Sequence, residues 1–205
     1  NLPPKAVLTL GAAAERATAD QHILLYPGIY KGQDACESTI ISRTINVSSM
    51  YGSNKTMIDC SYSIRAITLI DSIVTMKGIS FKGGIGPGAV HIELRRSNLN
   101  FYDALFQIGG ANGYSLFAMD RSHFNLTNAT FYRNLGGAIR VTSDTVGNLE
   151  TIIFRENWAH YGGALNIQDN SFINIIGAES YDHQSYLTGG FAYVSSNSTL
   201  NLSKL

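Results

Sequence analysis

Charged residues are scarce in this sequence. It has 15 Lys and Arg and 15 Asp and Glu among 205 residues, which is 15%, whereas soluble domains usually carry about 25%. The formal net charge is zero, and two basic residues adjoin only at Arg95-Arg96. Nucleic-acid binding needs a basic surface that neutralises phosphates, so this composition argues against a nucleic-acid partner.

Long apolar runs, linkers and metal-binding clusters are also missing. No apolar run approaches the roughly 20 residues of a membrane span, so none is expected in this chain. There is neither an initiator Met nor a signal peptide, and we expect a processed or trimmed product. The two cysteines, Cys36 and Cys60, have no pair of histidines near them, so neither a metal site nor a cofactor is expected.

Residues that favour strands and turns are plentiful instead. Ser, Thr, Asn, Gly, Ile and Tyr dominate, while the strong helix formers Lys, Glu and Arg are few. The pattern predicts one helix, Ala6–Ala17, and short early strands at Ile23–Tyr26, Ile40–Val47 and Met57–Cys60. No Pro-rich, Ser-rich or charged linker divides the chain, which indicates one domain.

An internal repeat is the strongest feature. The phrase FYRNLGGAIRV, from Phe131, returns as FRENWAHYGGALNI, from Phe154. Similar units follow one another along the chain at spacings of about 23 to 27 residues. They open with an alternating strand at Ala66, Ala89, Ser115, Ala138, Ala164 and Phe191. Repetition at this period predicts a solenoid.

Each unit contains the same sequence of parts. A polar corner ends at Ser72, Ser97, Ser122, Thr145, Ser171 and Ser198. Paired inward positions come next: Val74/Met76, Leu99/Phe101, Phe124/Leu126, Ile173/Ile175 and Leu200/Leu202, with Val146 and Leu149 in the irregular Thr145 unit. Four outward asparagines lie between such pairs: Asn100, Asn125, Asn174 and Asn201. A third strand ends at Phe81, Phe106, Phe131, Phe154 and Tyr181.

Three short strands in every unit predict an all-β fold, a right-handed parallel β-helix. Each coil would climb one strand spacing, about 4.8 Å, and stack like residues in columns. We expect residues 1–20 to form an N-terminal cap with the short helix, because a bare end exposes unpaired strand edges. Residues 21–205 form the β-helix of the same domain, which we expect to continue or stack beyond 205.

The repeated phrase resembles the F-x-x-N and G-G-A-[I/L/V] repeats of chlamydial polymorphic outer membrane proteins. The matching residues are Phe131, Asn134, Gly136, Gly137, Ala138 and Ile139, then Phe154, Asn157, Gly162, Gly163, Ala164 and Leu165. Other units depart from the pattern, so the clear match covers only the stretch from Phe131 to Ile167, and a loose one covers most of the chain. The helix followed by ILLYPGIYKG is similar to the start of pectin-lyase-like β-helices. The resemblance implies a parallel β-helix involved in adhesion and surface display.

Two features indicate an extracellular protein. The interval between Cys36 and Cys60 is close to one coil, so we expect a disulfide between adjacent coils; two separate thiols are the alternative. Six N-x-S/T sequons are candidate glycosylation sites: Asn46, Asn54, Asn125, Asn128, Asn197 and Asn201. Alternation places Asn46, Asn125 and Asn201 toward solvent.

The outer face of the first strand is where enzymes on this fold place their reactive groups. We expect a surface contact row there of His91, Arg140, Asn166 and Tyr193, with Thr68, and Glu93 beside it. The Ser115 unit would place Phe117 and Met119 on the same face. Hydrolysis needs two facing carboxylates. Only Glu93 is predicted on the face, and Asp120, Asp144 and Asp169 occupy turn positions.

The leading hypothesis is a secreted or cell-surface β-helix glycoprotein with a structural, adhesive or assembly role and no catalysis. It could be a filament subunit that stacks end to end. Its partners would be copies of itself, other extracellular proteins or a polysaccharide. The alternative is a carbohydrate-active enzyme, a polysaccharide lyase or hydrolase, or an inactive relative that binds polysaccharide.

Overall fold

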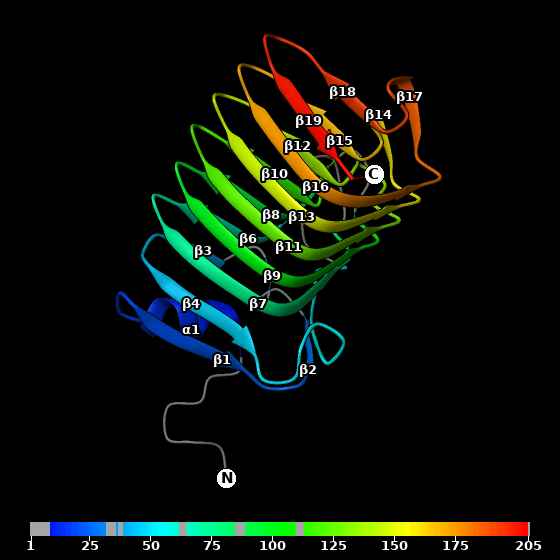
Figure 1. Ribbon diagram of the computed structural model, residues 1–205. Helices are drawn as coiled ribbons and strands as arrows, with labels where there is room; N and C mark the ends of the chain where they lie inside the picture. Colours follow the sequence, from blue (N-terminus) through cyan, green and yellow to red (C-terminus); the bar gives the residue numbers. More distant parts are fainter. Residues whose placement is uncertain are drawn as a thin grey trace.

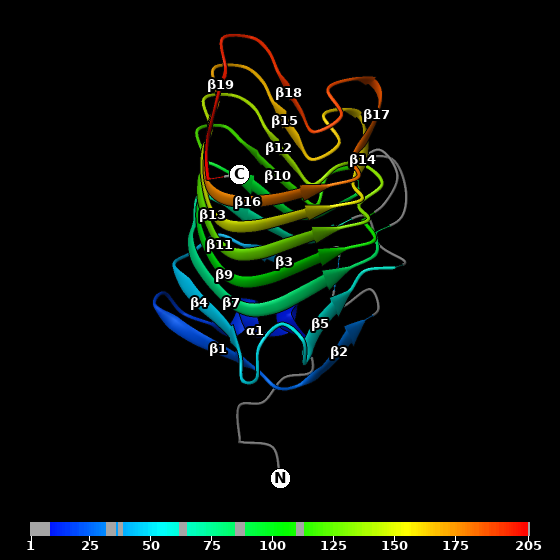
Figure 2. The same ribbon diagram turned by 45° about the vertical axis from the view of Figure 1, so that its right-hand side comes forward.

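The chain forms a right-handed parallel β-helix of stacked coils, seen in the computed structural model (Figures 1 and 2). The structure describes residues 9–31, 36, 39–61, 65–84, 89–109 and 113–204. Every described strand pair is parallel, and each strand lies beside its equivalent in the next coil. The predicted fold class is therefore confirmed.

Two large sheets and one small sheet build the coil wall. Sheet A contains β1 (Gln21–Leu25), β2 (Gly28–Lys31), β4 (Ile45–Ser49), β5 (Thr56–Asp59), β7 (Ile73–Lys82), β9 (Asn98–Gln107), β11 (His123–Tyr132), β13 (Val146–Arg155), β16 (Phe172–Tyr181) and β19 (Thr199–Ser203). Sheet B contains β3 (Thr39–Ile41), β6 (Arg65–Ile70), β8 (Val90–Arg95), β10 (Leu116–Met119), β12 (Ile139–Val141), β15 (Leu165–Ile167) and β18 (Ala192–Val194). Sheet C pairs β14 (Trp158–Tyr161) with β17 (Gln184–Thr188).

The strand count per coil differs from the prediction. From β7 to β16, the second and third predicted strands are one ten-residue strand with a bend in its middle. The bend residues have left-handed backbone, as at Asp103 (φ 55°) and Asn128 (φ 55°), and Asp and Asn tolerate this conformation well. The predicted strand Ile40–Val47 is also wrong, because the chain turns between β3 and β4 and joins two different sheets.

A short helix covers the N-terminal end. Helix α1 (Leu10–Arg16) begins after Thr9, whose hydroxyl accepts a hydrogen bond from the Ala12 amide at 3.1 Å. Leu10 and Ala14 are buried, and α1 packs against β3. The helix therefore starts later than predicted, since Thr9 is an extended cap; residues 6–8 of the predicted helix lie outside the described part.

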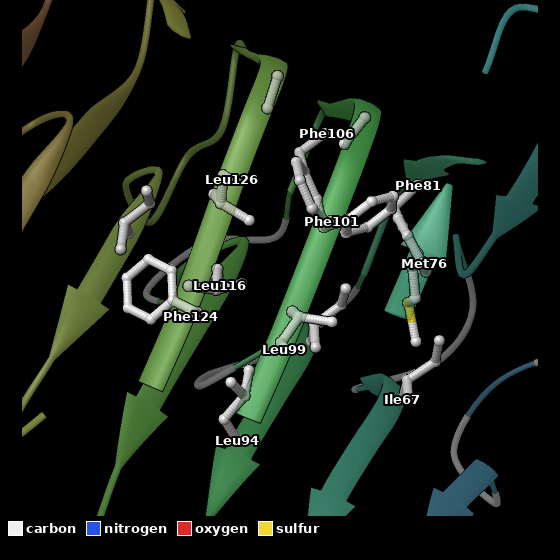
Figure 3. Packing of buried hydrophobic residues seen from close by; sticks show 14 of the residues in the cluster. Ile67, Met76, Phe81, Leu94, Leu99, Phe101, Phe106, Leu116, Phe124 and Leu126 are labelled. Atoms are coloured by element: carbon white, nitrogen blue, oxygen red, sulfur yellow. The ribbon is translucent and has the colours of Figure 1, made fainter. Parts of the chain in front are cut away.

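The interior is a set of apolar columns. Phenylalanine rings of successive coils stack at 5.4 Å (Phe81–Phe106), 4.7 Å (Phe106–Phe131) and 5.4 Å (Phe131–Phe154), close to the strand spacing. Figure 3 shows the labelled part of this core, where side chains of both sheets point into the same interior. In the irregular coil that follows Thr145, Gly147 occupies the position equivalent to Phe124. The Phe124 ring fills the space that a side chain at Gly147 would need.

The phenylalanine column ends before Tyr181, contrary to the prediction. Register pairs Ser180 with Phe154 and Tyr181 with Arg155. Tyr181 therefore points outward, with 49% of its surface exposed, and Phe191 covers Phe154 instead at 5.8 Å. Residues of the last described coil are consequently less buried than their equivalents below, as Leu202 shows at 40% exposure.

The asparagine of the F-x-x-N phrase has a structural explanation. Asn134 and Asn157 are fully buried at the corner after the phenylalanine. The Asn157 Oδ1 atom accepts from the Asn134 amide N–H (3.1 Å) and Nδ2 (2.8 Å), and its Nδ2 donates to the Phe131 carbonyl (3.0 Å). Gly136 lies against Gly113 so closely that any side chain would collide with its backbone. The asparagines of the phrase thus form the hydrogen bonds that buried backbone groups of the corner need, and its glycine allows neighbouring coils to pack closely.

The disulfide predicted between adjacent coils is present. Cys36 and Cys60 are bonded, with Cα atoms 5.8 Å apart, and both are buried. Their 24-residue separation corresponds to a stabilisation of about 3–4 kcal/mol in the loop-closure model. The bond ties the early coils together at the end that α1 covers.

Candidate functional site

The outer face of sheet B carries one continuous row of side chains. Strand register places Thr68, Glu93, Phe117, Arg140, Asn166 and Tyr193 in consecutive coils. Three members of the predicted contact row, Arg140, Asn166 and Tyr193, are therefore neighbours, and Phe117 lies where it was predicted. The residue type changes from coil to coil along this row, whereas the columns inside the coil repeat similar residues.

His91 does not belong to this row, and its prediction was wrong. The register pairs Ile67 with Ile92, so this coil is longer than the interval between Ala66 and Ala89, and Glu93 takes the predicted place of His91. His91 is 2% exposed, and its Nε2 is 2.7 Å from the Gly83 carbonyl oxygen. Burial lowers the pKa of His91 to about 4, so the ring is neutral.

The negative charge of the Glu93 carboxylate is balanced by two arginines. Its side chain is 1% exposed, Arg65 Nε lies 3.0 Å from its Oε2, and Arg95 forms a second ion pair with it. A buried carboxylate that is paired with two guanidinium groups offers no free oxygen to a substrate. The three aspartates near the face have left-handed φ angles, as predicted for turn residues: Asp120, Asp144 and Asp169.

A cleft of about 390 Å³ opens beside the row, at its C-terminal half. Its floor is formed by Arg140 and Asn166 of sheet B and by Gln168, which directly follows β15. Sheet C forms a wall with His160 and Tyr161. Figure 2 shows β14 and β17 standing beside β12, β15 and β18. The remaining lining residues are Tyr114, Leu135, Gly136 and Leu187.

A hydrogen-bonded network fixes the floor of the cleft. Asn166 Nδ2 donates to the Tyr114 hydroxyl at 2.8 Å, and that hydroxyl donates to the Tyr161 carbonyl at 3.0 Å. Burial raises the pKa of Tyr114, so the phenol keeps the proton that it donates. Arg140 Nη2 donates to Gln168 Oε1 at 3.2 Å, and its guanidinium lies 5.1 Å over the Phe117 ring.

Two buried polar atoms of this floor have no hydrogen-bond partner: Arg140 Nε, a donor, and Asn166 Oδ1, an acceptor. Buried polar atoms are usually satisfied, because an unpaired one costs about 1–3 kcal/mol. The Tyr161 and Tyr193 rings lie 5.0 Å apart at the same end of the row. The cleft therefore combines an unused donor, an unused acceptor and aromatic surface.

The sheet C wall was not predicted from sequence. His160 contacts the rings of Trp158 (5.9 Å) and Tyr186 (5.7 Å). The available signal was length: the last two unit spacings, which run from Ala138 through Ala164 to Phe191, both exceed the one before them. The extra residues lie in the corner between the sheets and build the wall.

No metal site or membrane helix is found where the structure describes the chain. Within the described ranges, no three His, Cys, Asp or Glu side chains gather as a metal site requires. No helix there is long and apolar enough to cross a membrane. The chemistry that the site offers is hydrogen bonding, one guanidinium charge and aromatic contact.

Fold and site together define a parallel β-helix protein with a polar, aromatic cleft on one sheet. No protein-family model matches the chain, and no curated protein matches its sequence. Among solved structures, the alginate lyase from Paenibacillus sp. str. FPU-7 is similar over 95% of this chain and 97% of its own, at 13% identity and a TM-score of 0.36. At this level, the likeness carries no argument about activity.

Proposed function

We propose that the chain is part of a secreted or cell-surface β-helix protein that binds an acidic carbohydrate in the sheet B cleft without converting it. The observation that carries the proposal is the pair of unpartnered buried atoms, Arg140 Nε and Asn166 Oδ1, on one cleft floor. A sugar offers hydroxyl groups that both donate and accept, so one ring can satisfy both atoms. Binding would recover the cost of leaving them unpaired.

The lining chemistry favours an anionic sugar. Arg140 carries the one permanent charge among the residues that line the cleft, and none of these residues is a carboxylic acid. A guanidinium binds carboxylate and sulfate groups through charge-assisted hydrogen bonds. Tyr161 and its neighbour Tyr193 supply aromatic surface for the apolar face of a sugar ring. The size of the cleft falls in the range of small-molecule sites, about 300–1,000 Å³.

The disulfide supports an extracellular setting, because such bonds persist in oxidising compartments. The resemblance of the F-x-x-N and G-G-A phrases to surface-displayed repeats supports an adhesive role. Self-association, by strand pairing between the end coils of two copies, belongs to the same proposal. Helix α1 covers the N-terminal end, so head-to-tail stacking of coils into a filament requires α1 to move.

Calorimetric titration with a galacturonic acid trisaccharide tests the binding proposal, with the carboxyl-reduced trisaccharide as the neutral comparison. We expect the acidic sugar to bind more tightly, and Arg140→Ala to weaken its binding about 10- to 100-fold. Lys77→Ala, which removes an exposed cation of sheet A, is the matched control and should leave affinity unchanged. Equal affinity of both trisaccharides, or no binding by a panel of acidic and neutral oligosaccharides, would refute the proposal.

A polysaccharide lyase is the second candidate. Arg140 lies in the same cleft as His160 and Tyr161, and lyase elimination needs a cation beside the uronate and a nearby base. Hydrolysis has less support, because the cleft lining holds no pair of carboxylates. Appearance of unsaturated uronate ends, followed by ultraviolet absorbance, would favour the lyase over simple binding.

A further inference from the structure

The six sequon asparagines are all exposed, and none of them lies on a described strand of sheet B. Asn148 and Asn170 are also exposed, whereas Asn134, Asn157 and Asn166 are buried. Four lie on strands of sheet A: Asn46 on β4, Asn125 and Asn128 on β11, and Asn201 on β19. Asn54 lies in the turn between β4 and β5, both of sheet A, and Asn197 lies in the corner that leads into β19.

We propose that these asparagines carry N-linked glycans, which cover the outer face of sheet A and leave sheet B bare. In this modification the Asn amide nitrogen attacks the anomeric carbon of a lipid-pyrophosphate oligosaccharide. A C–N bond forms, the C–O bond to the pyrophosphate breaks, and the amide proton leaves with the pyrophosphate product. The donor and the transferase belong to the secretory pathway of a eukaryotic cell.

The strand geometry supports attachment to the folded face. Asn125 points outward between the inward residues Phe124 and Leu126, so a sugar on its amide extends into solvent. Asn128 occupies the bend of the same strand, where its left-handed backbone also turns the side chain outward. Glycans at these two positions lie over the middle of sheet A.

With these glycans in place, the outer face of sheet A is covered and the outer face of sheet B stays accessible. The cleft floor, Arg140 and Asn166, belongs to sheet B, and no sequon lies on any described strand of that sheet. Bulky, hydrated glycans oppose protein contacts on the surface that they cover. Contacts with partners are therefore directed to sheet B and sheet C. This inference does not depend on which ligand the cleft binds.

The first experiment maps the modification on protein secreted from eukaryotic cells. Enzymatic deglycosylation in heavy-oxygen water converts each occupied Asn to a labelled Asp, which peptide mass spectrometry locates. We expect label at Asn125 and Asn201 and at least one further sequon. Absence of label at all six sequons overturns the proposal, whatever the result of the sugar-binding titration.

The second experiment tests coverage with a matched pair of tyrosines. Tyr102 is 42% exposed on sheet A, in register with Thr127 beside Asn125, and Tyr186 is 72% exposed on sheet C. Hydroxyl-radical labelling is measured before and after deglycosylation. We expect the labelling of Tyr102 to rise about twofold, because a bulky group is removed, and that of Tyr186 to stay constant. An equal change at both tyrosines would overturn the one-sided arrangement.

Discussion

Two columns of asparagine run along this β-helix, one inside a corner and one on the outer face of sheet A. In the inner column, Asn134 and Asn157 are fully buried and bond backbone groups of neighbouring coils. In the outer column, Asn125 Nδ2 donates to Asn100 Oδ1 at 2.7 Å and Asn148 Nδ2 donates to Asn125 Oδ1 at 3.0 Å. The residue type and the coil-to-coil repetition are the same.

The two columns differ in whether a side chain that loses its neighbour can form a hydrogen bond with water instead. An outer amide that loses its neighbour can bond to water, so the ladder contributes little net stability. An inner side-chain amide is buried away from water, so removing it leaves buried backbone groups without a hydrogen-bond partner. The comparison shows that a repeated Asn is evidence for stacking, whereas its energetic weight depends on burial.

The largest effect is expected for Asn157→Ala. The change removes the acceptor of the Asn134 amide N–H and the donor to the Phe131 carbonyl. It also removes one of the two hydrogen bonds of Asn134 Nδ2, which keeps its bond to the Phe106 carbonyl. At about 1–3 kcal/mol per unsatisfied buried group, we expect the free energy of unfolding to fall by about 3 kcal/mol. Urea denaturation followed by circular dichroism measures it. A loss below about 1 kcal/mol would contradict the role given to the inner column.

The next effect is a pH dependence at the same type of corner. In the two coils below Asn134, the positions of the inner column are occupied by Gly84 and Gly109, which have no side chain to bond the corner backbone. At the lower of these corners, the His91 ring bonds the Gly83 carbonyl. Its pKa is about 4 in the folded chain against 6.5 for a free ring, so the unfolded state binds more protons between these values. Stability is therefore lost as the pH falls through this window, by about 2 kcal/mol between pH 7 and pH 5.

His91→Leu removes the titrating group and should flatten the dependence of unfolding free energy on pH in this window. Urea denaturation at several pH values measures the slope. His123→Ala, at an exposed position of β11, is the control and should keep the wild-type slope. An unchanged slope in His91→Leu would mean that another group dominates the acid response. His183 is a second contributor of the same sign, because burial lowers its pKa.

The columns themselves could be predicted from the sequence, because their physical cause is periodic. Repetition at about 25 residues, alternation within strands and a polar corner together determine which residues stack. The corner serines show this: the Ser72 amide donates to Ser97 Oγ and the Ser97 amide to Ser122 Oγ, both at 3.2 Å. The Phe81–Phe154 stack and the Cys36–Cys60 bond follow from the same periodicity.

Errors arose where the coil length changes. The coil that pairs Ile67 with Ile92 is longer than the spacing of the sequence units indicated, and this offset was enough to place His91 outside although it is buried. The same kind of offset put Tyr181 in the phenylalanine column. Alternation fixes a face only after the register is known, and register at a corner depends on backbone geometry that the residue pattern does not contain.

The candidate site could be predicted only in its periodic half. Arg140, Asn166 and Tyr193 lie in equivalent positions of successive coils, so alternation found them. The wall residues His160 and Tyr161 belong to a corner insertion without a repeat partner, and no period constrains where they go. Alternation identified the outer asparagines as outward-facing. It gave no direction for Asn134 and Asn157, because they lie at a corner outside the alternating strands.

The smallest effect is expected in the outer column, for Asn148→Ala. The change removes the hydrogen bond to Asn125 Oδ1, but both amides are exposed and water replaces the lost partner. We expect the free energy of unfolding to change by less than about 0.5 kcal/mol, as for most exposed substitutions. Glycan occupancy at Asn125 should also be unchanged, since its sequon and its outward direction remain. A loss comparable with that of Asn157→Ala would mean that stacking itself, and not burial, determines what an asparagine column contributes.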